Sequence, residues 1–195
     1  NLTAFFRESH HFPLLAEHIR HKQDPVTIWC SAASTGEEPY SIAMTLLETL
    51  GAKASQAKVI ATDIDTDALA KARKGIYPQE QVRKLDEARV KRFFQKGTGN
   101  HIGLARVRPE VSALVEFMPL NLLAPQWPIK GPFDAIFCRN VMIYFDKETQ
   151  AKILKRFAPL MKQDGLLFAG HSENFSYISD AFKLRGQTVY TLANK

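Results

Sequence analysis

Polar and charged side chains follow several short apolar segments of this chain, where they could meet a ligand. In chain order these residues are Asp63, Asn121, Arg139 and Asn140. In an open α/β sheet, ligands bind in the crevice beyond the carboxyl ends of the strands. A carboxylate there can accept two hydrogen bonds from ribose hydroxyls, and we assign that role to Asp63. Asp65, two residues later, fits a helix N-cap instead.

Residues 31–41, SAASTGEEPYS, form a loop of small residues that opens a helix. Small side chains let a ligand approach the backbone, and a helix N-terminus offers free N–H groups. The loop has one glycine, so it lacks the GxGxxG pattern that binds a pyrophosphate. Glu37 and Glu38 would repel phosphate and attract a cation, although acids in a first turn also stabilise a helix. Together with the polar residues that follow the apolar segments, this loop favours a nucleoside ligand without phosphates. S-adenosylmethionine fits that description.

Histidines and cysteines give weaker signals. His18 and His21 share one helix face, but no carboxylate or cysteine completes a zinc site, so we expect no metal. His171 follows a strand-like segment and either lines the crevice or caps a loop. Cys30 and Cys138 lie in apolar segments without a CxxC spacing, which is typical of two reduced, buried thiols in a cytosolic protein.

Hydrophobic periodicity predicts the elements that position these residues. Strands are expected at 27–31, 58–63, 114–121, 133–139, 166–170, 182–185 and 188–192, and helices at 12–22, 38–50, 66–75 and 146–162. Residues 78–95 are expected to form one or two basic helical segments. This alternation predicts an α/β fold with a mostly parallel, helix-covered sheet that ends in an antiparallel hairpin. The glycine-rich stretch 97–111 interrupts the alternation, so we predict a small inserted β subdomain there.

Length and composition limit the class of protein. With 195 residues, 45% hydrophobic and 24% charged, the chain is one globular domain rather than a disordered or disulfide-stapled one. The net charge is +6, and eleven Lys and Arg stand against three acids between Lys71 and Arg108. Such a stretch suits an acidic partner or is a solvated surface. Because the chain begins at Asn1 rather than Met, we expect a domain of a longer protein.

Five motifs give the sequence a close resemblance to one family. TAFFRE, WCSAASTGEEPYSIAM, ATDID, FCRNVMIYF and LLFAGHSENF resemble the bacterial chemotaxis receptor methyltransferases, the CheR family, in order and over nearly the whole chain. The resemblance implies a Rossmann-like methyltransferase fold with seven strands, the last antiparallel. It also implies a catalytic domain at 1–195, an inserted β subdomain near 97–111, and the loss of most of an N-terminal helical domain.

The resemblance further implies an activity and its residues. The enzyme would transfer a methyl group from S-adenosylmethionine to glutamate side chains of chemotaxis receptors, giving methyl esters and S-adenosylhomocysteine in sensory adaptation. Arg7 and Tyr144 match the residues near the transferred methyl group. The family's cofactor contacts fall on Asn1, Thr3, Arg7, Ala32, Glu38, Asp63, Asn121, Leu122, Arg139 and Asn140. We place Glu38 near the cofactor's amino group and Asp63 near its ribose.

The partner implied is the cytoplasmic helical region of chemotaxis receptors. In some family members the inserted subdomain also binds the receptor's C-terminal peptide, and a member without this function would look similar in sequence. We expect a monomer in the cytoplasm that is recruited to membrane receptor clusters, binds no nucleic acid and does not insert into the membrane. Three other classes share features with this chain. A nucleic-acid methyltransferase explains the basic stretch, but no NPPY-like or PCQ-like segment is present. A non-catalytic binding module and an NAD-linked oxidoreductase are the others, and the latter lacks the glycine pattern.

Overall fold

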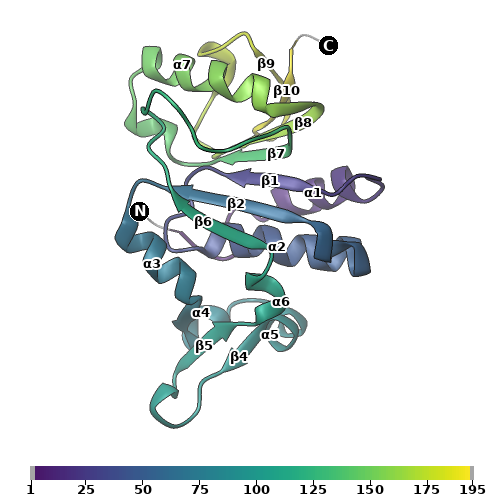
Figure 1. Cartoon of the computed structure of the whole chain (residues 1–195), viewed down its shortest axis with the longest axis vertical. Helices are drawn as coiled ribbons and strands as arrows, with labels where there is room; N and C mark the ends of the chain where they lie inside the picture. Colours follow the sequence, from purple (N-terminus) through teal and green to yellow (C-terminus); the bar gives the residue numbers. More distant parts are fainter. Residues whose placement is uncertain (1–2, 194–195) are drawn as a thin grey trace.

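The computed structural model describes residues 3–193, and a seven-stranded sheet forms its centre (Figure 1). In spatial order the strands are β6 (Val115–Pro119), β2 (Lys58–Asp63), β1 (Thr27–Cys30), β7 (Phe133–Cys138), β8 (Met161–Ala169), β10 (Val189–Leu192) and β9 (Phe182–Gly186). Neighbours from β6 to β8 are parallel, whereas β10 runs antiparallel to both β8 and β9. The predicted mostly parallel sheet with an antiparallel last strand is confirmed.

Strand residues alternate between two apolar layers, one on each face of the sheet. The main helices are α1 (His11–Ile19), α2 (Glu37–Leu50), α3 (Thr66–Lys74) and α7 (Lys147–Phe157). Ile28 and Phe137 belong to the layer with α1 and α2. Trp29 and Ile136, their neighbours in sequence, belong to the layer with α7. Because successive side chains of a strand point to opposite faces, helices on both sides bury the central strands.

A side-chain cap and a glycine set the ends of α3. The Asp65 carboxylate accepts hydrogen bonds from the backbone N–H groups of Asp67 and Ala68, as predicted for an N-cap. Gly75 ends the helix in the left-handed conformation, with φ of 62°, which glycine adopts without a steric penalty. The chain therefore leaves β2, turns at Asp63 and enters α3 along a fixed path.

The helix predicted at 146–162 is shorter in the structure. Its start is as expected, because the Asp146 carboxylate accepts the backbone N–H of Thr149. It ends at Phe157, and the 3-10 turn η4 (Ala158–Leu160) follows. Pro159 lies in that turn, and a proline cannot continue a helix because it lacks the N–H and its ring clashes with the preceding turn. β8 then begins at Met161, so the expected strand 166–170 starts five residues earlier than predicted.

A second, three-stranded antiparallel sheet projects from the end of α3 (Figure 1). Its order is β3 (Ile76–Pro78), β5 (Leu104–Val107) and β4 (Phe94–Lys96), and α4 (Gln79–Val82), α5 (Glu87–Phe93) and α6 (Pro109–Ser112) accompany it. Of the three strands, only β5 lies within the predicted range 97–111, because β3 and β4 both end before residue 97. The division into a catalytic domain and an inserted subdomain stays a prediction. Phe5 contacts Tyr77 and Phe94 edge to face, which ties the start of the described chain to this sheet.

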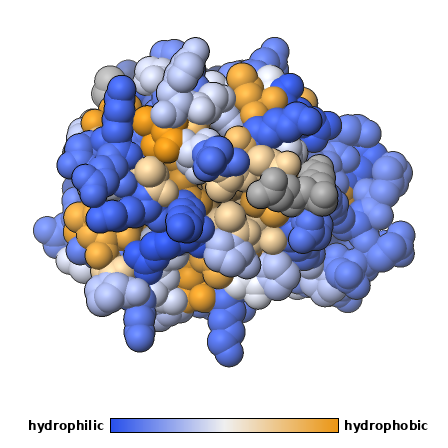
Figure 2. All heavy atoms as spheres, turned by 90° about the horizontal axis from the view of Figure 1, so that it is seen from above, coloured by the Kyte–Doolittle hydropathy of each residue, from blue (hydrophilic) through white to orange (hydrophobic). Residues whose placement is uncertain are grey.

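Hydrophilic residues cover most of the face that carries α7 and the closing hairpin, with apolar residues gathered near its middle (Figure 2). Leu184 and Tyr177 are among the exposed large apolar side chains of this part of the chain. None of the helices formed by residues 3–193 combines the length and the apolar character that crossing a bilayer requires.

Candidate functional site

Four parallel strands bring the predicted site residues to one edge of the sheet. In the order β6, β2, β1, β7, each strand ends at the same side, since Asp63 pairs with Pro119 and Cys30 pairs with both Ala61 and Phe137. The chain continues from β1 to β2 on one side, and β7 lies on the other. This reversal of strand order is the switch point where open α/β sheets bind ligands.

Asp63 fastens the loop after β1 to the loop after β2. Its Oδ2 accepts the backbone N–H of Ser34 at 2.7 Å, and its Oδ1 accepts that of Asp65 at 2.9 Å. Ser34 has a φ of 50° and Gly36 a φ of 102°, so the loop takes a backbone path that side chains disfavour. An ionised carboxylate has about four acceptor positions, so Asp63 can hold this loop and still accept ribose hydroxyls.

Glu38 and Arg139 form a buried ion pair, with 2.5 Å between Oε1 and Nε. The other oxygen of Glu38 accepts a hydrogen bond from the Cys30 thiol at 3.0 Å. Burial raises the pKa of Cys30 well above its usual value, so this thiol is a neutral donor. Arg139 also donates to the Arg7 carbonyl oxygen at 2.8 Å. The pair therefore joins α2, the end of β7 and the N-terminal segment.

His11 completes this network from α1. Its Nδ1 lies 3.0 Å from Arg139 Nη1, and its Nε2 lies 3.1 Å from the Gln187 carbonyl oxygen. Because a guanidinium only donates, Nδ1 accepts and the proton is on Nε2. Burial, and then the charge of Arg139, lower the pKa of His11 to about 4, which keeps the ring neutral at physiological pH.

Asn140 stands where three segments meet. Its φ is 63°, a left-handed conformation that asparagine tolerates better than most residues. Its side-chain Nδ2 donates to Glu8 Oε2 at 3.1 Å, and its backbone N–H donates to Glu173 Oε1 at 2.8 Å. Phe6 and Glu8 also have positive φ, at 56° and 51°. Backbone strain of this kind gathers at functional sites.

The other predicted residues differ in how far they are exposed. Asn121 is exposed and its Oδ1 accepts the Leu123 N–H at 2.9 Å, while Leu122 is buried. Tyr144, in the 3-10 turn η3 (Met142–Tyr144), is 66% exposed. Thr3, Arg7 and Ala32 are half-buried. Asn1 lies outside the described residues.

The remaining candidates from the sequence are two cysteines and two histidines. Cys30 and Cys138 are both free and buried. His18 Nε2 donates to the Asp134 carbonyl oxygen at 3.1 Å, and His171 is exposed. Within residues 3–193, no three His, Cys, Asp or Glu side chains are grouped as a metal site would need.

The strand order, the switch point and the acidic strand end define a Rossmann-like methyltransferase fold. PKMT2 from Rickettsia typhi has a similar solved structure, with a TM-score of 0.51 and 15% identity over 87% of this chain and 26% of that one. The family model described as "CheR methyltransferase, SAM binding domain" matches residues 1–191. The chain belongs to the CheR methyltransferase family, and its cofactor is S-adenosylmethionine.

Curated relatives agree with this assignment. The chemotaxis protein methyltransferase of Escherichia coli (strain K12) is 62% identical over 99% of this chain and 68% of that protein. The protein of the same name from Klebsiella aerogenes is 62% identical over the whole chain and 67% of that protein. Chemotaxis protein methyltransferase 2 of Pseudomonas aeruginosa is 55% identical over 99% of this chain.

The donor set fits this cofactor. Glu8 Oε1 is a buried carboxylate oxygen with no hydrogen-bond partner among the described residues, so a cationic donor would satisfy it. Asp63 suits ribose hydroxyls, and Glu8 suits a ligand that carries an ammonium, whereas the charge of Glu38 is already paired with Arg139. The site has no phosphate-binding glycine pattern, as a cofactor without phosphates requires.

Sequence reasoning missed three residues of this site, namely Glu8, His11 and Glu173. Glu8 and Glu173 lie inside the motifs TAFFRE and LLFAGHSENF, next to the predicted candidates Arg7 and His171. No local pattern distinguishes His11 from its neighbour His10. A signal existed for Glu173, since a lone acid soon after an apolar strand either is exposed or binds backbone N–H groups.

Proposed function

We propose that this protein methylates glutamate side chains on the cytoplasmic helices of chemotaxis receptors and forms glutamate methyl esters in sensory adaptation. The observation that carries the proposal is the 62% identity with the Escherichia coli chemotaxis protein methyltransferase over 99% of the chain. The positions of Asp63, Asn121, Arg139 and Asn140 support it, because they lie at or just after the carboxyl ends of β2, β6 and β7. We further propose a monomer that acts in the cytoplasm at membrane receptor clusters.

Methyl transfer to a glutamate carboxylate requires little proton transfer by the protein. S-adenosylmethionine, when bound, supplies the methyl group on a sulfonium. A glutamate side chain has a reference pKa of about 4.3, so it is already ionised at pH 7 and needs no strong general base. The protein must instead hold the substrate carboxylate in line and exclude water around it. Correct alignment can contribute about 7–11 kcal/mol in favourable systems.

Arg7 and Tyr144 are the residues we assign to this alignment. The carbonyl oxygen of Arg7 is held by Arg139, which fixes the backbone from which its guanidinium extends. A guanidinium binds carboxylates in a bidentate manner, and we assign Arg7 to the carboxylate of the cofactor. Tight pairing with the substrate carboxylate would slow its attack. Tyr144 is 66% exposed, so a large substrate can reach it.

The test is a methylation assay with labelled cofactor. The protein is incubated with S-adenosylmethionine labelled on its methyl group and with membranes that carry a chemotaxis receptor. We expect label on the receptor that alkali releases as methanol, because esters are base-labile. Membranes with receptor whose methyl-accepting glutamates are changed to glutamine should take up no label. Transfer to RNA or DNA instead of the receptor would contradict the proposal and support a nucleic-acid methyltransferase.

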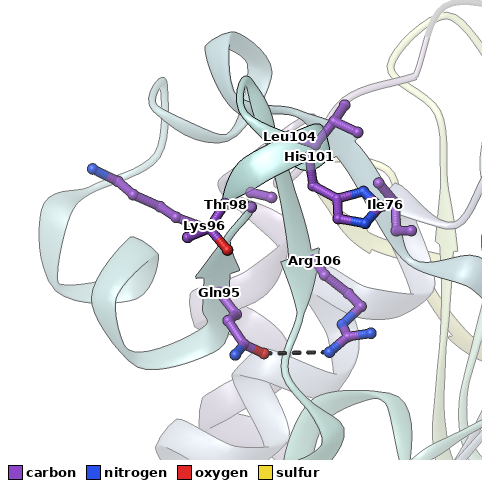
Figure 3. Close-up of a pocket in the computed structure, with 9 residues that line it drawn as sticks. Ile76, Gln95, Lys96, Thr98, His101, Leu104 and Arg106 are labelled. Carbon is purple, nitrogen blue, oxygen red and sulfur yellow. Dashed lines mark hydrogen bonds between the residues drawn. The ribbon is translucent and has the colours of Figure 1, made fainter.

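A pocket in the small sheet supports a second role, which is to hold the receptor's C-terminal peptide. The pocket has a volume of about 220 Å³ and lies on the small sheet (Figure 3). It is lined by Ile76, Gln95, Lys96, Gly97, Thr98, His101, Leu104, Ala105 and Arg106. β3 and β4 are the outer strands of this sheet, and an extended peptide can add to such an edge. The exposed side chains of Lys96 and Arg106 are cationic and suit a peptide that ends in a carboxylate.

Peptide binding tests this second role separately. A fluorescent peptide with the receptor's C-terminal sequence should bind the protein, and Lys96→Glu and Arg106→Glu should weaken that binding. Lys155→Glu, an exposed lysine on α7, is the matched control and should leave it unchanged. Equal binding by all variants would place the peptide elsewhere.

A further inference from the structure

Glu173 lies between two loops at the candidate site, and we propose that it is a positioning residue for the cofactor. It follows β8 and fixes the loop after β7, which carries Asn140 and Tyr144. This inference rests on the proposed assignment of Asn140 to the cofactor. No part of the predicted donor set includes Glu173, whose neighbour His171 is exposed.

The Glu173 carboxylate accepts three backbone N–H groups. Oε1 accepts those of Asn140 and Gly170, both at 2.8 Å, and Oε2 accepts that of Met142 at 2.9 Å. The residue is only 6% exposed. Hydrogen bonds from N–H groups to an ionised acceptor are roughly twice as strong as neutral ones. One side chain thus joins the loop after β7 to the loop after β8.

Asn140 is held from the opposite side as well. A Cβ atom at Gly170 would lie 2.4 Å from Asn140 Oδ1, so a side chain at position 170 would displace the amide. The amide Nδ2 donates to Glu8, whose second oxygen is a buried acceptor without a partner among residues 3–193. Glu173 therefore holds the backbone of Asn140 in a position from which its side chain reaches Glu8 in the N-terminal segment.

The isosteric amide cannot replace this carboxylate. Glutamine has one carbonyl oxygen and an NH₂ group that only donates. In Glu173→Gln at least one of the three backbone N–H groups would therefore face another donor or lose its partner. Leaving a buried donor unsatisfied is costly, and the loop from Asn140 to Tyr144 would move to relieve the clash.

The decisive experiment compares S-adenosylhomocysteine binding by calorimetry with unfolding in urea. For Glu173→Gln we expect affinity to fall about tenfold or more. The amide NMR signals of Asn140, Met142 and Gly170 should also move. Glu173→Asp keeps the charge and both oxygens, and it should recover part of the affinity.

Asp134→Asn is the matched control. Asp134 is fully buried at the other end of β7, where it accepts the Thr27 N–H and pairs with Lys162. Its loss should lower stability and leave S-adenosylhomocysteine affinity unchanged. If Glu173→Gln behaves in the same way, with lower stability and unchanged affinity, the residue is merely structural and the proposal is wrong.

A second variant and a readout that uses no receptor complete the test. If Glu173→Gln does not fold, Gly170→Ala disturbs Asn140 from the other side and should also weaken binding; unchanged affinity there would overturn the proposal. Because the readout uses no receptor, failure of receptor methylation in the unmodified protein would refute the proposed function alone. Affinity that depends on Glu173 would still support the inference in that case.

Discussion

Arg139 and Glu38 are 101 residues apart in the sequence, yet their side chains form an ion pair that is almost inaccessible to solvent. Burying two charges is costly unless further hydrogen bonds complete the arrangement. Arg139 has such bonds to the Arg7 carbonyl oxygen and the His11 ring. The pair is thus the point at which the N-terminal segment, α2 and β7 are fixed relative to one another.

Removing one partner of this pair should be strongly destabilising. In Glu38→Gln the guanidinium of Arg139 stays buried without its counter-charge, and we expect a loss of about 3–5 kcal/mol in the free energy of unfolding. Urea denaturation measures it. Glu17→Gln removes an exposed pair with Arg20 and should change stability by less than about 1 kcal/mol. Similar small losses in both variants would show that the buried pair contributes no more than a surface pair.

Substitutions at Asp63 and Asp65 should distinguish cofactor binding from helix capping. Asp63→Ala should lower S-adenosylhomocysteine affinity about tenfold or more, because it frees the loop at Ser34 and removes the ribose acceptor. Asp65→Ala removes the N-cap of α3 and should cost about 1 kcal/mol of stability with little change in affinity. Calorimetry and urea unfolding measure the two effects. Asp63→Ala with impaired methylation and normal cofactor affinity would contradict the ribose assignment.

His11 should make stability depend on pH. Its pKa is about 4 in the folded protein and about 6.5 when unfolded, so the unfolded chain binds more protons between these values. The contribution of His11 is therefore complete above about pH 6.5 and is lost as the pH falls towards 4. His11→Gln should flatten this part of the urea-midpoint profile. His10→Gln, at an exposed neighbour, should leave the slope as it is, and equal slopes in all three proteins would exclude His11 as the cause.

Local patterns in the sequence predicted the elements around the cofactor well. β2 spans 58–63 as predicted, and α3 has the expected cap and terminal glycine. Both depend on neighbouring residues: an apolar run, a capping acid, a glycine that can adopt positive φ. The position of Asp63 at the end of β2 was predictable for the same reason, since the end of a strand is visible in the sequence.

Contacts between distant segments were not predictable. His11 and Arg139 are 128 residues apart, and the partners of Glu173 are backbone N–H groups of two loops. Nothing in the side-chain pattern reveals which backbone group a buried acid will bind. The range predicted for the small sheet, 97–111, includes only one of its three strands for a related reason. β3 pairs with β5 although two short helices, α4 and α5, lie between them in the chain.

Tyr144 should affect turnover rather than cofactor binding. Tyr144→Phe removes only the hydroxyl, and we expect receptor methylation to slow about tenfold or more while S-adenosylhomocysteine affinity stays within about twofold. Initial rates with labelled cofactor and calorimetry give the two values. Tyr177→Phe, at another exposed tyrosine, is the control. Unchanged turnover in Tyr144→Phe would remove this residue from the proposed mechanism.

The basic stretch 71–108 should steer an acidic receptor segment towards the site. Its cations include Arg83, Lys84 and Arg92, which are all exposed. Charge steering is screened by salt, since the Debye length falls from about 30 Å at 0.01 M to about 8 Å at 0.15 M. We expect methylation at low receptor concentration to fall roughly tenfold over that range. The double variant Arg83→Gln/Lys84→Gln should be slower at low salt and less sensitive to added salt.

Lys152 and Lys155 provide the matched control for this effect. They are exposed on α7, at the end of the molecule opposite the small sheet (Figure 1), and the double glutamine variant has the same net charge as Arg83→Gln/Lys84→Gln. If the stretch steers the receptor locally, only the Arg83 and Lys84 variant loses salt dependence. If both variants lose it equally, net charge alone is responsible. Methylation that does not change with salt in the unmodified protein would show that the basic stretch is a solvated surface with no part in receptor encounter.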